Sequence, residues 1–349
     1  MRLRDIFYAT CVVLGTLLLA YVLYELSDLI VVVFVALIFA STVRPILRGM
    51  TRRHIPQWLS ILIIYAGTAL ALVGLILLAV PPIVTLMMDV FQNNNLINTM
   101  SYSLMRTGLA FQRQFDIFIP VLSLPAQFRA FTDMADQTIK EQAMPFASNA
   151  FYVLGQIVLA VVISVYWLTA RRQALRNLLR ATPRQYQPTI SHIWIDTEEM
   201  LGGYFRGQII LGLAVGTASL VGLLVLRVPN ALPLAVIAGL LEFVPFVGPI
   251  GAAIPAVLMG LTVSPLIALL VGLLYVVIQQ VEGNYLVPRI MSSSVSLHPL
   301  IVLIAIFAGF QLNGVVGALL AVPLAGIMQI VLRHLPAAAD SPEDEPTQA

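Results

Sequence analysis

The sequence predicts an all-α integral membrane protein with about six full transmembrane helices, two helix-break-helix hairpins and a small α-helical extracytoplasmic domain. Apolar residues form 59% of the 349-residue chain and charged residues only 10%, well below the roughly 25% charged residues of soluble domains. The apolar residues come in long blocks, and about 18 apolar residues in a row can cross a membrane. Because lipid cannot hydrogen-bond to the backbone, each block should be helical.

The first apolar block covers about residues 6–43 and is interrupted only near Glu25 and Asp28. This pattern favours two short spans joined by a tight acidic turn. The segment RPILRGMTRRHIPQ follows, with four arginines and no acidic residue. Basic loops next to spans stay in the cytoplasm, so Arg44-Pro45 is expected to end the second span at the inner membrane face.

The third predicted span runs from about residue 58 to residue 80 and ends at Pro81-Pro82, because proline interrupts helices. Apolar residues recur at helical spacing in the more polar segment that follows, which predicts short amphipathic helices outside the cytoplasm. The fourth predicted span covers about residues 151–169. Five arginines between residues 171 and 184 place the next loop in the cytoplasm.

These features divide the chain into six predicted regions. They are a three-span region at 1–82, an extracytoplasmic helical domain at 83–147, a fourth span at 148–170, a cytoplasmic amphipathic segment at 171–203, a C-terminal core at 204–335 and a disordered acidic tail at 336–349. The basic loops agree on one topology, a multi-pass protein with both termini in the cytoplasm.

The C-terminal core holds two plain spans, at about 207–226 and 266–281, and two longer apolar pieces, at about 232–261 and 299–332. Thirty helical residues extend about 45 Å, more than the roughly 30 Å hydrocarbon core. Both long pieces carry helix breakers: Pro245, Gly248, Pro249 and Gly251 in the first, and Gly314, Gly317 and Pro323 in the second.

We therefore expect two helical hairpins that enter the membrane and return, since irregular backbone is tolerated there only inside protein or beside water. Eight simple spans with kinked helices are the alternative. A shift of 66 residues aligns one proline, glycines and several apolar residues of the two pieces. One span separates them, so they would form an inverted repeat, a common transporter architecture with the binding site at the repeat interface.

Glu242 and Glu282 are the only acidic residues between Glu199 and Asp340. A charge in the membrane costs about 2.5–3.5 kcal/mol on insertion scales, so a functional role is the default hypothesis. Glu242 could bind a cation or shuttle a proton, or it could cap the broken helix. Glu282 could join a polar cluster at a pathway mouth, or form a local salt bridge with Arg289.

Further polar residues lie near these acids. Gln279 shares a helix face with Glu282, and Asn284 follows in the same expected loop. Other candidates are Gln311 and Asn313 in the second break, which could line a polar route or satisfy backbone groups, and Arg206 and Gln208 at the cytoplasmic entrance of the fifth span. Arg206 could equally be an interfacial anchor. The glycines of the breaks are expected to permit close helix approach.

Several function classes are excluded by the sequence. No nucleotide-binding loop, paired-histidine motif or Ser/His/Asp set is present, and Cys11 is the only cysteine. The basic residues do not interleave with aromatic residues, so a nucleic-acid partner is not expected. We therefore expect a protein that is not an enzyme, needs no cofactor or metal, and works in the lipid bilayer on a small polar solute or cation.

The runs YFRGQIILGLAVGTASLVGLLVLRVPNALPLAVIAGLLEFVPFVGPIGAAIPAVLMGL and QQVEGNYLVPRIMSSSVSLHPLIVLIAIFAGFQLNGVVGALLAVPLAGI resemble the autoinducer-2 exporter family, also called the permease-like or PerM family. The resemblance covers nearly the whole chain. It implies a homo-oligomeric transporter of the bacterial inner membrane that exports small solutes, with autoinducer-2 as the namesake substrate.

The family also includes apparent sodium or lithium/proton antiporters, so that activity is an alternative, as are a passive oligomeric channel and a membrane scaffold. The residues that match the family pattern are Pro245, Gly248, Pro249, Gly251, Asn284, Pro288, Arg289, Gly314, Gly317 and Pro323. The family varies at the position of Glu242, which weakens an obligatory proton role, and SSSVSLHP departs from its usual glycine.

Overall fold

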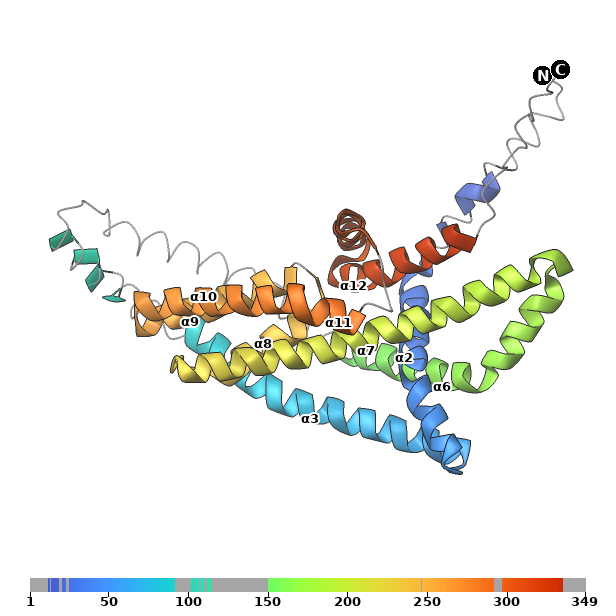
Figure 1. The fold of residues 1–349 in the computed structure, drawn as a ribbon, viewed down its shortest axis with the longest axis horizontal. Coiled ribbons are helices and arrows are strands. Elements are labelled where there is room, and N and C mark those ends of the chain that lie inside the picture. Colours follow the sequence, from blue (N-terminus) through green and yellow to red (C-terminus); the bar gives the residue numbers. More distant parts are fainter. Residues whose placement is uncertain are drawn as a thin grey trace, which may run out of the picture.

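The computed structural model describes an assembly of long α-helices (Figure 1). The described residues are 12, 14–18, 21–22, 25–91, 102–103, 105–106, 108–109, 112–113, 150–245, 247–291 and 297–334. Within these residues no strand occurs, which confirms the all-α prediction. Most of the predicted extracytoplasmic domain and the acidic tail lie outside them.

Helix α2 (Ser27–Arg52) begins at a bend, not at a tight turn. The amide of Leu26 bonds to the carbonyl of Val22, and the amide of Ile30 bonds to the carbonyl of Leu26. Helical hydrogen bonds on both sides of Leu26 carry the chain onward in one general direction, so the predicted reversal near Asp28 is not observed. The side of the membrane that holds the N-terminus therefore stays a prediction.

The prolines at two predicted span ends do not end their helices. Pro45 lies inside α2, which continues to Arg52, and α3 (Gln57–Phe91) continues through positions 81–82. A proline removes one amide donor but need not end a helix when other groups satisfy the freed carbonyl. Arg206 supplies such a group in α2: its guanidinium donates to the carbonyls of Ser41 and Thr42, at 3.4 and 3.2 Å, and the Ser41 carbonyl is the one that Pro45 leaves without its usual partner.

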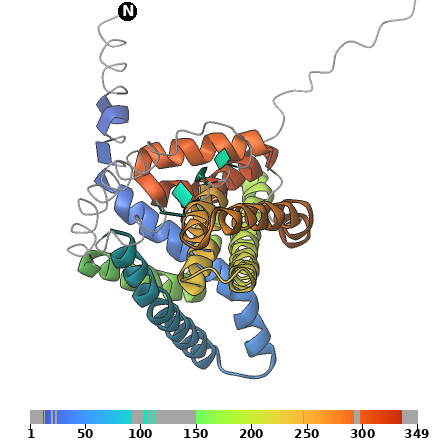
Figure 2. The same cartoon turned by 90° about the vertical axis from the view of Figure 1, so that its left-hand side faces the viewer.

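The predicted cytoplasmic segment is a pair of helix extensions. Helix α6 (Ala150–Ala181) and helix α7 (Gln187–Val225) meet at a short 3₁₀ turn, η1 (Arg184–Tyr186). At 39 residues, α7 is about 58 Å long, nearly twice the hydrocarbon thickness. It lies along the longest axis of the molecule in Figure 1 and is seen nearly end-on in Figure 2.

Helices α8 (Ala231–Leu241) and α9 (Val247–Val263) form the first predicted hairpin. Their buried residues belong to one cluster in which Ala238 and Leu234 of α8 join Ala252 and Ala256 of α9. These pairs are symmetric about position 245, as antiparallel arms around a tip at Pro245 require. With 11 and 17 residues, each arm is shorter than the roughly 20 residues that a full crossing takes.

Helix α10 (Pro265–Val281) continues into a π turn, η2 (Glu282–Leu286), and then α11 (Val287–Met291). Ser264 caps α10, since its hydroxyl accepts a hydrogen bond from the amide of Ile267 at 3.2 Å. The expected loop that holds Asn284 and Arg289 is therefore helical. A one-turn π segment absorbs an extra residue without ending the helix.

Helix α12 (Pro299–His334) is the second predicted hairpin, because its backbone leaves the helical region at Asn313 and Gly314. Gly309 and Gly317 lie against each other's carbonyls across the two arms, 299–312 and 315–334; both arms are visible in orange and red in Figure 2. Gly314 has φ +56°, and a Cβ added at this position would meet no atom within 4 Å. Its role is the left-handed turn, not the close helix approach that we expected.

Among the described residues, six helices are long and apolar enough to cross a membrane. Five of them correspond to the second to sixth predicted spans, and the other is the hairpin α12. The first predicted span falls mostly outside the described residues. The two hairpins open toward opposite ends of α7: α8 starts just after Val225, whereas His334, at the end of α12, lies 3.3 Å from Asp196 near the start of α7.

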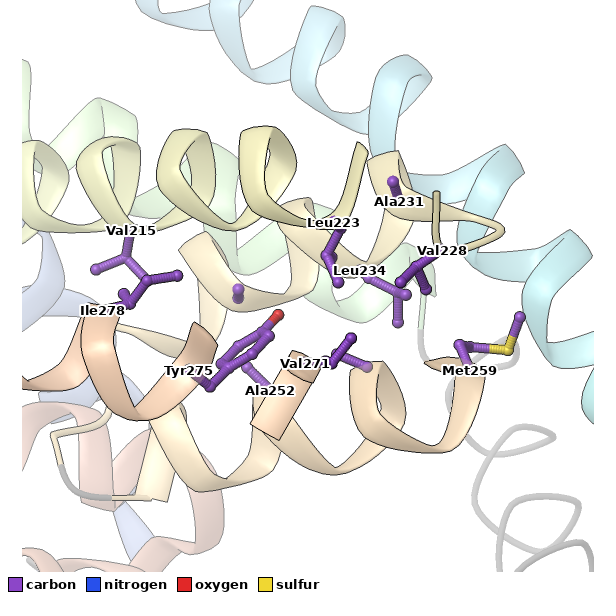
Figure 3. Packing of buried hydrophobic residues seen from close by; sticks show 12 residues of the cluster. Val215, Leu223, Val228, Ala231, Leu234, Ala252, Met259, Val271, Tyr275 and Ile278 are labelled. Carbon is purple, nitrogen blue, oxygen red and sulfur yellow. The ribbon is translucent and has the colours of Figure 1, made fainter. Parts of the chain in front are cut away.

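The main core is the interface of α7, α10 and the first hairpin (Figure 3). Leu223 of α7 and Leu234 of α8 are fully buried side by side, and Val271 and Tyr275 of α10 pack beside them. Val215 and Ile278 lie at one end of this cluster, and Met259 lies at the other. This packing fixes how far the hairpin tip reaches along α7.

Candidate functional site: a buried carboxyl pair

Glu242 occupies the tip of the first hairpin, directly after the last residue of α8. Helix α8 ends there because Pro245 cannot donate to the carbonyl of Leu241. The amide of Val244 takes that carbonyl instead, at 2.9 Å. Gly248 approaches the same carbonyl so closely that a Cβ would overlap it, so the tight tip requires glycine at this position.

Gln208 of α7 holds the tip in place. Its side-chain amide donates to the backbone carbonyl of Glu242, and both side chains are buried. The carbonyl needs this donor because the helix has ended and water has no access to it. In the structure, Gln208 lies beside the hairpin tip, and its expected place at a cytoplasmic entrance stays a prediction.

Glu282 begins the π turn after α10 and faces Glu242. The two carboxyl groups are close enough to interact electrostatically, and the side chains are 3% and 6% exposed. The Oε2 atom of each is buried and has no hydrogen-bond partner among the described residues. Two ionised carboxylates this close in an apolar setting repel strongly, so the pair is stable only when it holds a proton or another cation.

Tyr204 completes the site from one turn earlier on α7. Its hydroxyl is buried without a described partner and is close enough to Glu242 to interact with its charge. Its ring packs with Val244 and with Ile306 and Ala318 of the second hairpin. Tyr204 thus connects the carboxyl pair and the tip of the first hairpin to both arms of the second hairpin.

The oxygen-only character of the site limits what it can bind. Tyr204, Glu242 and Glu282 offer oxygen atoms, which suit a proton or a hard cation rather than a transition metal. Within the described part of the chain, no group of three histidine, cysteine, aspartate or glutamate residues could hold a metal ion.

Other predicted site residues lie apart from this pair. Gln279, Asn284 and Arg289 are exposed, and the amide of Asn284 donates to Gln280 at 3.3 Å. Glu282 is directed to Glu242, so the predicted alternative of a Glu282–Arg289 bridge is not observed among the described contacts.

The second hairpin's polar residues also lie apart. Gln311 and Asn313 are exposed at its tip, while Pro323 is fully buried in its second arm. Arg206 is half-buried, and its guanidinium donates hydrogen bonds to the carbonyls of Ser41 and Thr42 in α2, away from the carboxyl pair. Only Gln208, Glu242 and Glu282 of the predicted polar set come together.

A second buried charge cluster was missed by the sequence interpretation. Glu198 of α7 is 8% exposed and binds two arginines. Its carboxylate lies 2.7 Å from the guanidinium of Arg44 in α2. Both of its carboxylate oxygens accept hydrogen bonds from Nε of Arg171 in α6, at 2.5 and 2.6 Å. Arg44 was assigned only to the end of a span. No local pattern could identify this cluster, because its members are up to 154 positions apart.

Replacing Gln208 with leucine should lower the free energy of unfolding by about 1–2 kcal/mol, because the buried carbonyl of Glu242 loses its donor. Thermal unfolding of the purified protein in detergent measures this. Gln280→Leu is the matched control, since Gln280 is an exposed amide and should change little. Equal effects of both variants would contradict the assigned role of Gln208.

Comparison with known proteins agrees with a membrane transport role. A family model described as "AI-2E family transporter" matches residues 12–337. The chain is 27% identical over 317 residues to "Putative transport protein YueF" of Bacillus subtilis, which covers 87% of this chain and 83% of that protein. It is 26% identical over 187 residues to "Putative permease PerM" of Escherichia coli, with 52% and 51% covered.

Proposed function

Since the chain belongs to the AI-2E transporter family, we propose that it is a secondary transporter of the bacterial inner membrane in which Glu242 and Glu282 carry a proton or monovalent cation. The cargo moved outward in exchange is a small polar solute, with autoinducer-2 as the candidate. The observation that supports this most is the buried carboxyl pair, with its unpartnered oxygens, at the tip of a helical hairpin.

The surroundings of the pair suggest how binding and movement are coupled. When the pair is empty and ionised, repulsion between the carboxylates favours separation of the hairpin tip from the end of α10. When a cation is bound, the tip stays seated on Gln208 and against the second hairpin through Val244. Hairpins that open toward opposite ends of α7 would then be exposed to opposite sides in turn, as alternating access requires.

Flux measurements in vesicles test the proposal. The purified full-length chain is reconstituted into liposomes with a pH-sensitive dye inside, and Na⁺, Li⁺ or labelled autoinducer-2 is added against an imposed pH gradient. The wild type should dissipate the gradient with at least one of these. Glu242→Gln and Glu282→Gln should reduce the coupled flux to the level of protein-free vesicles, because a neutral amide cannot exchange a proton.

Glu199→Gln is the control, since Glu199 is an exposed acid on α7 outside the pair, and it should retain full flux. If both pair variants keep gradient-driven flux, coupling through the acids is wrong. If solute moves but never beyond equilibrium, whatever ion gradient is imposed, the protein is a passive channel. Absence of any flux of these solutes in the wild type, with folded protein in the vesicles, would favour a scaffold.

A further inference from the structure

A pocket of about 420 Å³ lies between α2, α3 and α6, away from the carboxyl pair. Phe39 of α2 and Tyr65 of α3 line it, and their rings pack edge to face with centroids 5.4 Å apart. The Tyr65 hydroxyl and the Ser164 hydroxyl of α6 are 2.7 Å apart, which joins the helices at this level. Partly exposed apolar side chains, including Leu72 and Ile157, line the rest.

The pocket's position and chemistry exclude water as its occupant. Its three main helices are all long and apolar enough to lie in the membrane, and an apolar cavity does not hold ordered water. Its volume is in the range of ligand pockets, about 300–1,000 Å³. An apolar chain supplied by the bilayer therefore satisfies both the size and the surface of this pocket.

A polar group of residues stands at the end of the pocket opposite the arginine-rich end of α2. Gln156 lines the pocket and follows Tyr152 by one helical turn. The hydroxyl of Tyr152 donates to the carboxylate of Asp28 at 2.6 Å. Glu25, one helical turn before Asp28, adds a second exposed carboxylate. An occupant with a positively charged head would place that head beside the two acids.

We propose that this pocket is a binding site for one phospholipid whose head group carries a primary ammonium, as phosphatidylethanolamine does. One acyl chain fills the pocket, and the ammonium pairs with Asp28. Val316, three residues after Asn313, also lines the pocket, so the bound chain contacts the second hairpin beside its break. Through this site, a bound lipid contacts the second hairpin directly. The proposed lipid site does not depend on transport coupling by the carboxyl pair.

Lipid retention by the purified full-length protein tests the site. The protein in detergent is titrated with palmitoyl-oleoyl phosphatidylethanolamine or with the phosphatidylglycerol of the same chains, and native mass spectrometry and the thermal midpoint report binding. Phosphatidylethanolamine should bind about fivefold more tightly, as one partly exposed ion pair provides. Asp28→Asn should make the two lipids bind equally.

Variants that fill the pocket with a larger side chain provide a second test of the site. Ala69 of α3 lines it, so Ala69→Phe should abolish the retained phosphatidylethanolamine, whereas Ala66→Phe, on an exposed position of α3 outside the lining, should keep it. Ala160→Phe, from the α6 side, should repeat the loss if Ala69→Phe fails to fold. Unchanged retention in a folded pocket-filling variant, or equal affinity of wild type for both lipids, would overturn the proposal.

Discussion

Replacing Glu198 with alanine is expected to lower the free energy of unfolding by about 3–5 kcal/mol, the usual effect of removing one partner from a buried ion pair. Arg44 and Arg171 are only 16% and 15% exposed and share the single carboxylate. Without it, two guanidinium groups from α2 and α6 remain close together in a poorly solvated site. Chemical unfolding in mixed detergent micelles would measure the loss.

Glu199→Ala is the matched control for this experiment. Glu199 is adjacent in sequence but exposed, so its removal should change the unfolding free energy by less than about 0.5 kcal/mol. A Glu198→Ala protein as stable as the Glu199→Ala protein would mean that the cluster does not join α2, α6 and α7 in the membrane.

Replacing Gly317 with alanine is expected to destabilise the second hairpin by about 1–3 kcal/mol. A Cβ at position 317 would overlap the backbone carbonyl of Gly309 in the other arm, and backbone cannot move aside as a flexible side chain can. The arms would have to separate at the tip, next to Ala318 and the cluster that contains Tyr204 and Val244. Transport should therefore fall together with the thermal midpoint.

Gly67→Ala is the comparison, because a Cβ at position 67 of α3 meets nothing within 4 Å. Alanine favours helix over glycine by about 1 kcal/mol, so this variant should be as stable as the wild type or more stable. If Gly317→Ala has the same neutral effect, the two arms of α12 are not packed against each other as described.

The hairpins were predictable from sequence because their signals are local. Length against membrane thickness and the prolines around Pro245 were sufficient to predict the first break, and glycines at the second indicated the other. Helix ends were less predictable: Pro45 ends no helix, since its effect is offset by Arg206 from a helix more than 160 positions away. A single sequence does not reveal which distant donor satisfies a freed carbonyl.

The candidate site was half predictable for the same reason. Two isolated acids in apolar sequence indicated Glu242 and Glu282 separately, because the cost of burying a charge depends only on local composition. That they face each other depends on the register between α8 and α10, which packing around Leu234 and Tyr275 determines. The partnership of Glu198 with two arginines arises from the same kind of long-range packing.

The uninterrupted length of α7 links three of these features mechanically. Helix α7 holds Glu198, Arg206 and Gln208 within three helical turns, and its C-terminal end leads into the first hairpin. A tilt of α7 at its N-terminal extension would shift the hairpin tip by an amount that grows with the distance along the helix. A molecule that binds the extension formed by α6 and α7 could thus control the carboxyl pair from outside the bilayer.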